Sequence, residues 1–90
     1  MRTASFTQSL NRFFPDLTTT EIKAGTVREA INELESRWPG LSKYIVDDQG
    51  ALRKHVHVFI GNEFIKDRRH LSDPIGEGDK IYIMQALSGG

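Results

Sequence analysis

Apolar residues recur with the period of an α-helix between positions 26 and 40. Five of them fall at the spacing i, i+3, i+4, i+7 and i+11, which places them on one helical face: Val27, Ala30, Ile31, Leu34 and Trp38. Thr26 is placed to cap the amino end, and Glu29, three residues later, completes a capping box. The Pro-Gly pair at 39–40 prevents the helix from continuing. The pattern therefore predicts one amphipathic helix with both ends marked.

Alternation with a period of two predicts strands on both sides of this helix. Residues 4–10 alternate in this way, and "TTTEIKA" at 18–24 is rich in β-branched residues, so we expect a hairpin across the turn-like "FFPDL" at 13–17. After the helix, "KHVHVFI" at 54–60 and "KIYIM" at 80–84 predict two further strands.

The two later strands each have an apolar face that suits a core. Five β-branched residues are expected to face the helix: Val56, Val58, Ile60, Ile81 and Ile83. Three large side chains then lie on the opposite face of the sheet: Phe59, Tyr82 and Met84. Exposed aromatic and methionine side chains on such a face indicate a partner-docking surface, with a satellite core under a loop as the alternative.

The order of elements is two strands, one helix and at least two more strands, with short connections except at 42–54. A single amphipathic helix must bury its apolar face against one side of the sheet. We therefore predict an α+β domain of the β-grasp (ubiquitin-like) type, with a mixed sheet of four to five strands on one main helix. The expected domain covers residues 1–85, followed by a flexible C-terminal tail at 86–90.

Composition excludes several classes of function. A net charge of zero gives no electrostatic footprint for nucleic acid. The absence of cysteine excludes disulfides, thiolate metal sites and a cysteine nucleophile. No segment approaches the roughly 20 apolar residues that a membrane-spanning helix needs. We therefore expect a cytoplasmic protein without nucleic-acid or membrane partners.

Catalytic and metal-binding patterns are weak in this sequence. His55 and His57 project from the same face of one predicted strand, but His70 and the nearby acids supply no convincing third ligand. No serine-histidine-carboxylate motif or glycine-rich phosphate loop is present, so we expect no catalytic residues and no metal. Five basic residues form either a rim for an acidic partner or a solvated face: Arg53, Lys54, Lys66, Arg68 and Arg69.

Three stretches carry a family resemblance: "GTVREAINELESRWPGL" at 25–41, "HVHVFIGNEFI" at 55–65 and "PIGEGDKIYIMQALSGG" at 74–90. Together they resemble the ubiquitin-like small sulfur-carrier family (MoaD/ThiS-like), and they look most like the carriers of cysteine biosynthesis. The resemblance implies that the carboxylate of Gly90 is adenylated and converted to a thiocarboxylate. It also implies that Gly89, Ser88 and Leu87 give this end access to a narrow channel. Many members approach the glycines through a proline, which is absent here.

The resemblance further implies which molecules the chain meets. The partners would be an adenylating (E1-like) activating enzyme, a sulfur donor such as a cysteine desulfurase or rhodanese, and a sulfur-accepting synthase, with the exposed sheet face used for docking. ATP would be used by the activating enzyme, and the chain would be a protein cosubstrate rather than an enzyme. The resemblance favours cysteine biosynthesis as the accepting pathway, with molybdopterin biosynthesis as the main alternative. Thiamine, siderophore and other secondary-metabolite pathways stay open as well. Two alternatives remain: a ubiquitin-like modifier, and an interaction module with an inert tail.

Overall fold

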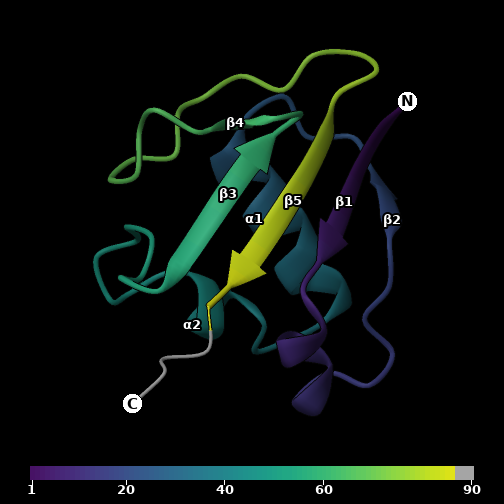
Figure 1. Ribbon diagram of the computed structural model, residues 1–90, viewed down its shortest axis with the longest axis vertical. Helices are drawn as coiled ribbons and strands as arrows, with labels where there is room; N and C mark the ends of the chain where they lie inside the picture. Colours follow the sequence, from purple (N-terminus) through teal and green to yellow (C-terminus); the bar gives the residue numbers. More distant parts are fainter. Residues whose placement is uncertain (87–90) are drawn as a thin grey trace.

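The computed structural model describes residues 1–86, which form one sheet covered on one face by a helix (Figure 1). The sheet has five strands in the order β2-β1-β5-β3-β4, so the predicted α+β, β-grasp class is confirmed. The elements are β1 (Arg2–Phe6), η1 (Gln8–Arg12, a 3-10 turn), β2 (Thr20–Ile22), α1 (Val27–Arg37), α2 (Ser42–Ile45), β3 (Val56–Ile60), β4 (Glu63–Phe64) and β5 (Lys80–Gln85).

Of the tail predicted at 86–90, only Ala86 is part of the described chain. The four residues assigned to the reactive end and its approach lie outside the described residues: Leu87, Ser88, Gly89 and Gly90.

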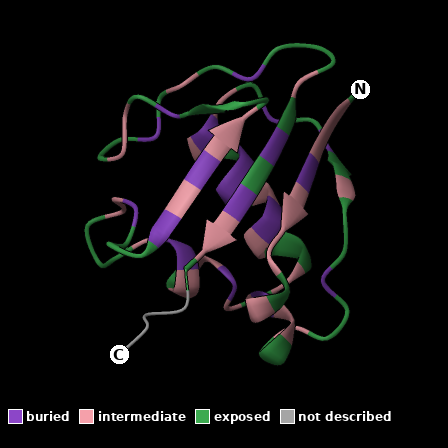
Figure 2. Cartoon of the chain, in the orientation of Figure 1, coloured by how far each residue is buried: buried purple, intermediate pink, exposed green. Residues whose placement is uncertain are grey.

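Strand β5 lies at the centre of the sheet. It runs parallel to β1, where Ala4 is opposite Ile81, and antiparallel to β3, where Val58 is opposite Ile83. All four of these side chains are buried. Figure 2 shows the resulting alternation of buried and less buried positions along β3 and β5. The apolar side of the sheet centre therefore faces the core, as the sequence pattern predicts.

Helix α1 supplies the other half of the core. Its buried residues are the predicted ones, namely Val27, Ala30, Ile31 and Leu34. Burying one such large aliphatic side chain contributes roughly 1.5–3 kcal/mol. Trp38, directly after the helix, is half-buried and meets Phe6 of β1 edge to face, with ring centroids 6.2 Å apart. The carboxyl end of the helix is thus fixed to β1.

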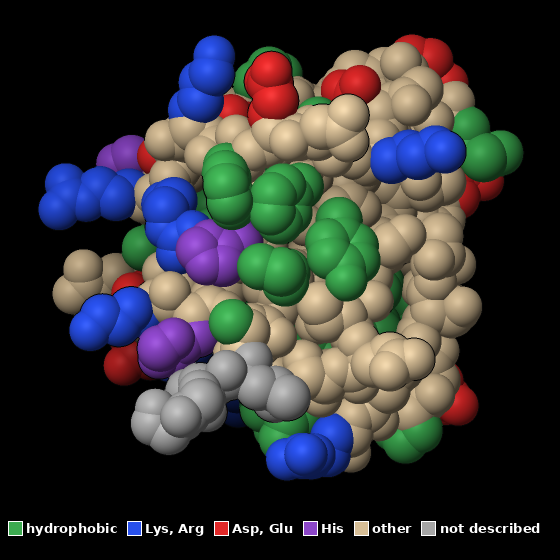
Figure 3. Space-filling view, viewed as in Figure 1, with side chains coloured by type: hydrophobic (Ala, Val, Ile, Leu, Met, Phe, Trp, Pro, Cys, Tyr) green, Lys and Arg blue, Asp and Glu red, His purple; other side chains and the backbone are tan. Residues whose placement is uncertain are grey.

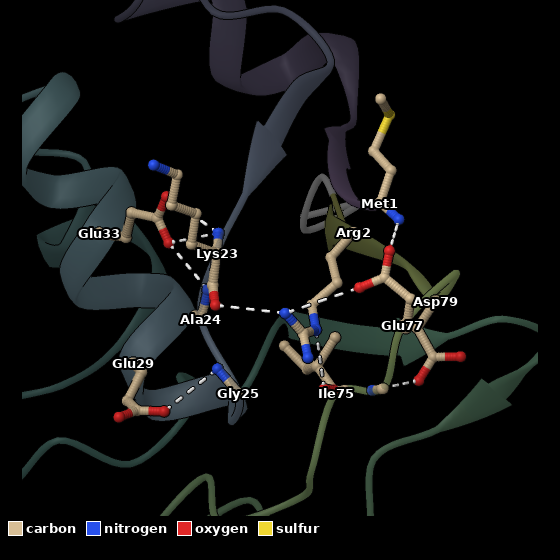
Figure 4. Close-up of polar contacts among 11 residues, drawn as sticks. Met1, Arg2, Lys23, Ala24, Gly25, Glu29, Glu33, Ile75, Glu77 and Asp79 are labelled. Carbon is tan, nitrogen blue, oxygen red and sulfur yellow. Dashed lines mark hydrogen bonds and ion pairs between the residues drawn. The ribbon is translucent and has the colours of Figure 1, made fainter.

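Two glutamates of α1 hold the connection from β2 (Figure 4). Glu29 accepts a hydrogen bond from Gly25 N at 3.2 Å, and Glu33 accepts from the backbone N–H groups of residues 23–24 at 3.0 and 3.1 Å. The Thr26 hydroxyl accepts from Glu29 N at 3.2 Å, which confirms the predicted cap. The Glu29 carboxylate accepts from Gly25 N instead of from Thr26 N. The second hydrogen bond of the predicted capping box is therefore shifted by one residue towards the amino end.

The connection at 65–79 is long and docks on the start of α1, whereas short connections were expected here. The carbonyl of Leu71 accepts from Arg28 N at 2.9 Å, which satisfies one of the free N–H groups of the first helical turn. Asp67 organises the loop by accepting from His70 N at 2.9 Å and from the Ser72 hydroxyl. These hydrogen bonds lower the pKa of Asp67 from 3.8 to about 2, and the bond from the Ser72 hydroxyl has the largest effect.

The prediction of one strand over residues 4–10 is wrong beyond Phe6. β1 ends there, and η1 follows. Leu10 is still fully buried, because the turn directs its side chain to the core, with Leu10 N donating to Thr7 O at 3.2 Å. Serine and threonine hydroxyls compete for backbone partners and favour leaving a strand. β1 and β2 do pair antiparallel as predicted, but they are joined by residues 7–19 rather than by a tight turn.

Candidate functional site

The sheet face opposite α1 carries the three predicted docking residues, and β3 and β5 bring them together. Phe59 is opposite Tyr82 across the two strands, with ring centroids 6.4 Å apart, and Met84 is opposite His57. Tyr82 is 37% exposed, while Phe59 and Met84 are half-buried. Figure 3 shows hydrophobic side chains gathered on this face beside a histidine. The structure thus places the three residues on one surface, and their role in docking stays a prediction.

Phe64 belongs to the same surface but was absent from the predicted set. Its ring lies 4.5 Å from that of Phe59 between centroids, and the side chain is 60% exposed. The signal was present in the sequence, because a two-residue Gly-Asn turn at 61–62 fixes the hairpin register and so sets Phe64 opposite Phe59. Gly61 has a φ of 63°, as such turns require.

His57 of β3 lies beside this surface, whereas His55 precedes the strand. The ring of His57 meets Phe64 edge to face, with centroids 5.5 Å apart, and its Nδ1 is 3.4 Å from Arg68 Nη1. His55 is exposed. Within residues 1–86, no group of three or more His, Cys, Asp or Glu side chains is arranged to hold a metal ion.

A closed ring of hydrogen bonds holds the end of β5. Gln85 N donates to Thr7 Oγ1 at 3.1 Å, Thr7 Oγ1 lies 3.1 Å from Ser9 Oγ, and Ser9 Oγ donates to Gln85 O at 3.2 Å. A serine hydroxyl has one proton, and Ser9 gives it to Gln85, whose Oε1 is also 3.3 Å away. Thr7 is therefore the donor to Ser9. The hydroxyls of Thr7 and Ser9 thus bind the backbone N–H and C=O of Gln85, the last residue of β5, in the way that the backbone of a neighbouring strand would.

On its other side, the end of β5 is held by the segment that leads into β3. Ala86 N donates to His55 O at 2.8 Å. The chain therefore leaves the sheet with its backbone held from both sides, by the hydroxyl ring and by this carbonyl. Sequence reasoning missed Thr7 and Ser9, because it placed both in a strand.

The predicted basic rim is only partly free. Arg68 Nη2 donates to Arg53 O and to Val56 O, both at 2.9 Å, so its guanidinium ties the start of β3 to the 65–79 connection. Arg53 Nε donates to Lys43 O at 2.6 Å. The remaining three members are exposed: Lys54, Lys66 and Arg69. In the part of the chain that the structure describes, none of the five is in an ion pair.

None of the helices within residues 1–86 has the length and apolar character needed to cross a bilayer.

Comparison with known proteins places the chain in a family. The ThiS family model matches residues 6–90. The sulfur carrier protein CysO of Mycobacterium tuberculosis is 28% identical over 67 residues, which are 72% of each chain. A chain in the crystal structure of the Amycolatopsis orientalis BexX/CysO complex superposes with a TM-score of 0.84 at 26% identity, covering 100% of both chains. The crystal structure of Mycobacterium tuberculosis CysO gives a TM-score of 0.82 at 22% identity, covering 97% and 100%.

Both solved structures share the fold of this chain over almost the whole of each chain. The family model begins in β1 and extends through β5 to residue 90. Since that match covers far more than half of the chain, the protein belongs to the ThiS family and is related to the sulfur carrier CysO.

Proposed function

We propose that the protein carries sulfur as a thiocarboxylate on Gly90 and donates it in the biosynthesis of a cofactor or of cysteine. The observation that carries this proposal is the match to the ThiS family, which includes the central strand β5 and continues through residue 90. The hydroxyl ring and His55 O support it, because they fix the point from which the chain leaves the sheet at Gln85 and Ala86.

The chemistry needs activation, because a carboxylate is a poor acyl donor. The Gly90 carboxylate attacks the α-phosphorus of ATP, pyrophosphate leaves, and an acyl-adenylate forms. Hydrosulfide then attacks the acyl carbon and expels AMP, which leaves the thiocarboxylate. If an enzyme persulfide is the donor, an acyl disulfide forms first, and a thiol must reduce it. In this proposal an E1-like enzyme binds the ATP, and the chain acts as the protein cosubstrate.

The need to enter the ATP-binding cleft of such an enzyme explains the glycine pair at 89–90. Five extended residues span at most about 16–18 Å. Glycine has no Cβ, so the pair at 89–90 fits a channel that larger side chains would block. The docking surface would be the sheet face formed by Phe59, Tyr82 and Met84. A related chain is found in a complex with BexX, which supports partner binding by carriers of this kind.

Intact-protein mass spectrometry tests the proposal. The full chain is incubated with ATP, Mg²⁺, sulfide and a family activating enzyme. We expect an AMP adduct and then the mass increase that corresponds to replacing one oxygen by sulfur. Deletion of Gly90 should abolish both products, whereas Gln8→Ala, which changes an exposed side chain on η1, should leave them unchanged. The absence of both products with every family activating enzyme tried contradicts the proposal, and adducts to lysine side chains would instead indicate a modifier.

The docking surface has its own test. Tyr82→Ala should weaken binding of the activating enzyme, since exposed aromatic anchors often carry a large part of an interface energy. Phe13→Ala is the matched control, because Phe13 is 47% exposed, stacks on Tyr44 of α2 and belongs to no strand of the sheet. Equal binding of both variants would contradict the assignment of this face.

A further inference from the structure

A groove of about 710 Å³ lies beside β3, where β4 stops after two residues. Three buried side chains form its apolar floor: Leu52, Val58 and Ile65. Phe64, which is 60% exposed, forms one wall of the groove. The volume is within the range of roughly 300–1,000 Å³ that is typical of ligand pockets. The groove can therefore take one or two large apolar side chains.

The charged groups that line the groove are all basic. They are Lys54 and Arg68, with the ring of His57 beside them. No acidic side chain lines it, and neither cation is in an ion pair within residues 1–86. The apolar floor is thus combined with a positive rim, which favours a ligand with an apolar group next to a negative charge.

Arg68 is held in place before any ligand binds. Its Nη2 donates to Arg53 O and Val56 O, and its Nη1 faces His57. A guanidinium that is already fixed loses little conformational freedom when it meets a carboxylate. Lys54 is exposed, so its ammonium group is accessible from solvent. The rim therefore contains one ordered cation and one accessible cation.

We propose that this groove binds a segment of a protein partner in which a leucine or phenylalanine side chain stands next to an aspartate or glutamate. The apolar side chain lies on the floor formed by Leu52, Val58 and Ile65, and the carboxylate meets the rim formed by Lys54 and Arg68. This inference goes beyond the proposed function, because it does not depend on any chemistry at Gly90.

The test titrates the ¹⁵N-labelled full chain with the capped peptide Gly-Leu-Phe-Asp-Glu-Gly and with its neutral counterpart Gly-Leu-Phe-Asn-Gln-Gly. We expect amide shifts concentrated at residues 52–58 and 64–68. Loss of two charge contacts should weaken binding of the neutral peptide by about tenfold. The mass-spectrometric test at Gly90 is separate, so failure of one experiment does not affect the other.

Two variants change the groove without touching the core. Lys54→Glu should weaken binding of the acidic peptide by about fivefold or more, and Phe64→Ser should weaken binding of both peptides, since it removes an apolar wall. Lys80→Glu is the matched control, because Lys80 is an exposed lysine at the start of β5 and does not line the groove. We expect it to leave the affinity unchanged.

Several results would overturn the proposal. These are equal affinity for the two peptides, no effect of Lys54→Glu, or shifts confined to Tyr82 and Met84. Identical shifts with inorganic phosphate at the same concentration would indicate an anion site instead. Shifts that depend on protein concentration without peptide would indicate a second copy of this chain as the occupant.

Discussion

The hydroxyl ring at the end of β5 makes a sharp prediction for Thr7→Val. Valine matches threonine in shape but removes the hydroxyl, and with it the bond from Gln85 N and the bond to Ser9. The Gln85 N–H then stays half-buried without its partner. A net hydrogen bond is worth about 1 kcal/mol, and leaving a buried donor unpaired costs about 1–3 kcal/mol.

We therefore expect the local opening free energy at Gln85 to fall by about 1–2 kcal/mol. Because 1.4 kcal/mol corresponds to a factor of ten, the Gln85 amide should exchange with solvent about tenfold faster in Thr7→Val. Ser9→Ala keeps the bond from Gln85 N to Thr7, so its effect on that amide should be smaller, about threefold.

Amide hydrogen exchange followed by NMR measures these rates directly. The Trp38 amide, which donates to Leu34 O at the end of α1, is the internal reference and should not change. Thr18→Val is the matched control, because Thr18 is exposed and its hydroxyl forms no hydrogen bond within residues 1–86. Unchanged exchange of Gln85 in Thr7→Val would refute the role of the ring, and equal acceleration of the Trp38 amide would show global destabilisation instead.

Three further predictions concern stability. Asp67 has its pKa lowered to about 2 in the folded chain, so its contribution is present above its ordinary value of 3.8 and is lost as the pH falls from there towards 2; in Asp67→Asn, the urea midpoint should be lower at neutral pH but should fall less across this interval. Gly50→Ala should destabilise by more than about 1 kcal/mol, because Gly50 has a φ of 83° and an added Cβ would lie 2.9 Å from Arg28 Nη1; an unchanged melting temperature would contradict this. Thr26→Ala removes the hydroxyl that caps Glu29 N and should cost about 1 kcal/mol in denaturant unfolding, with Thr26→Ser restoring most of it.

The sequence was sufficient to predict an element and its buried face where the apolar residues of that element recurred with one period. The helical spacing from Val27 to Leu34 predicted both α1 and its buried face, and alternation predicted β3 and β5 with the correct faces. It failed after Phe6, because the short 3-10 turn at 8–12 also buries Leu10. Local alternation therefore does not distinguish that turn from a continued strand.

The polar part of the site was beyond sequence reasoning for a different reason. The ring joins Thr7 and Gln85, which are 78 positions apart, and it exists only because β1 and β5 pair in one register. The wall residue Phe64, in contrast, followed from the Gly-Asn turn and was missed only because that register was not worked out. The role of Gly90 came from the family resemblance and stays a prediction.

The central place of β5 has a consequence for biosynthesis. Translation proceeds from the amino end, so β1, β2, α1 and β3 are synthesised before β5. Until then β1 and β3 have no strand between them, and the core side of the sheet is open at its middle. Pairing between such distant segments is slow to form, because a long loop must close first. An incomplete chain therefore has no folded carrier body, and it stays open to chaperones and proteases until its last strand is in place.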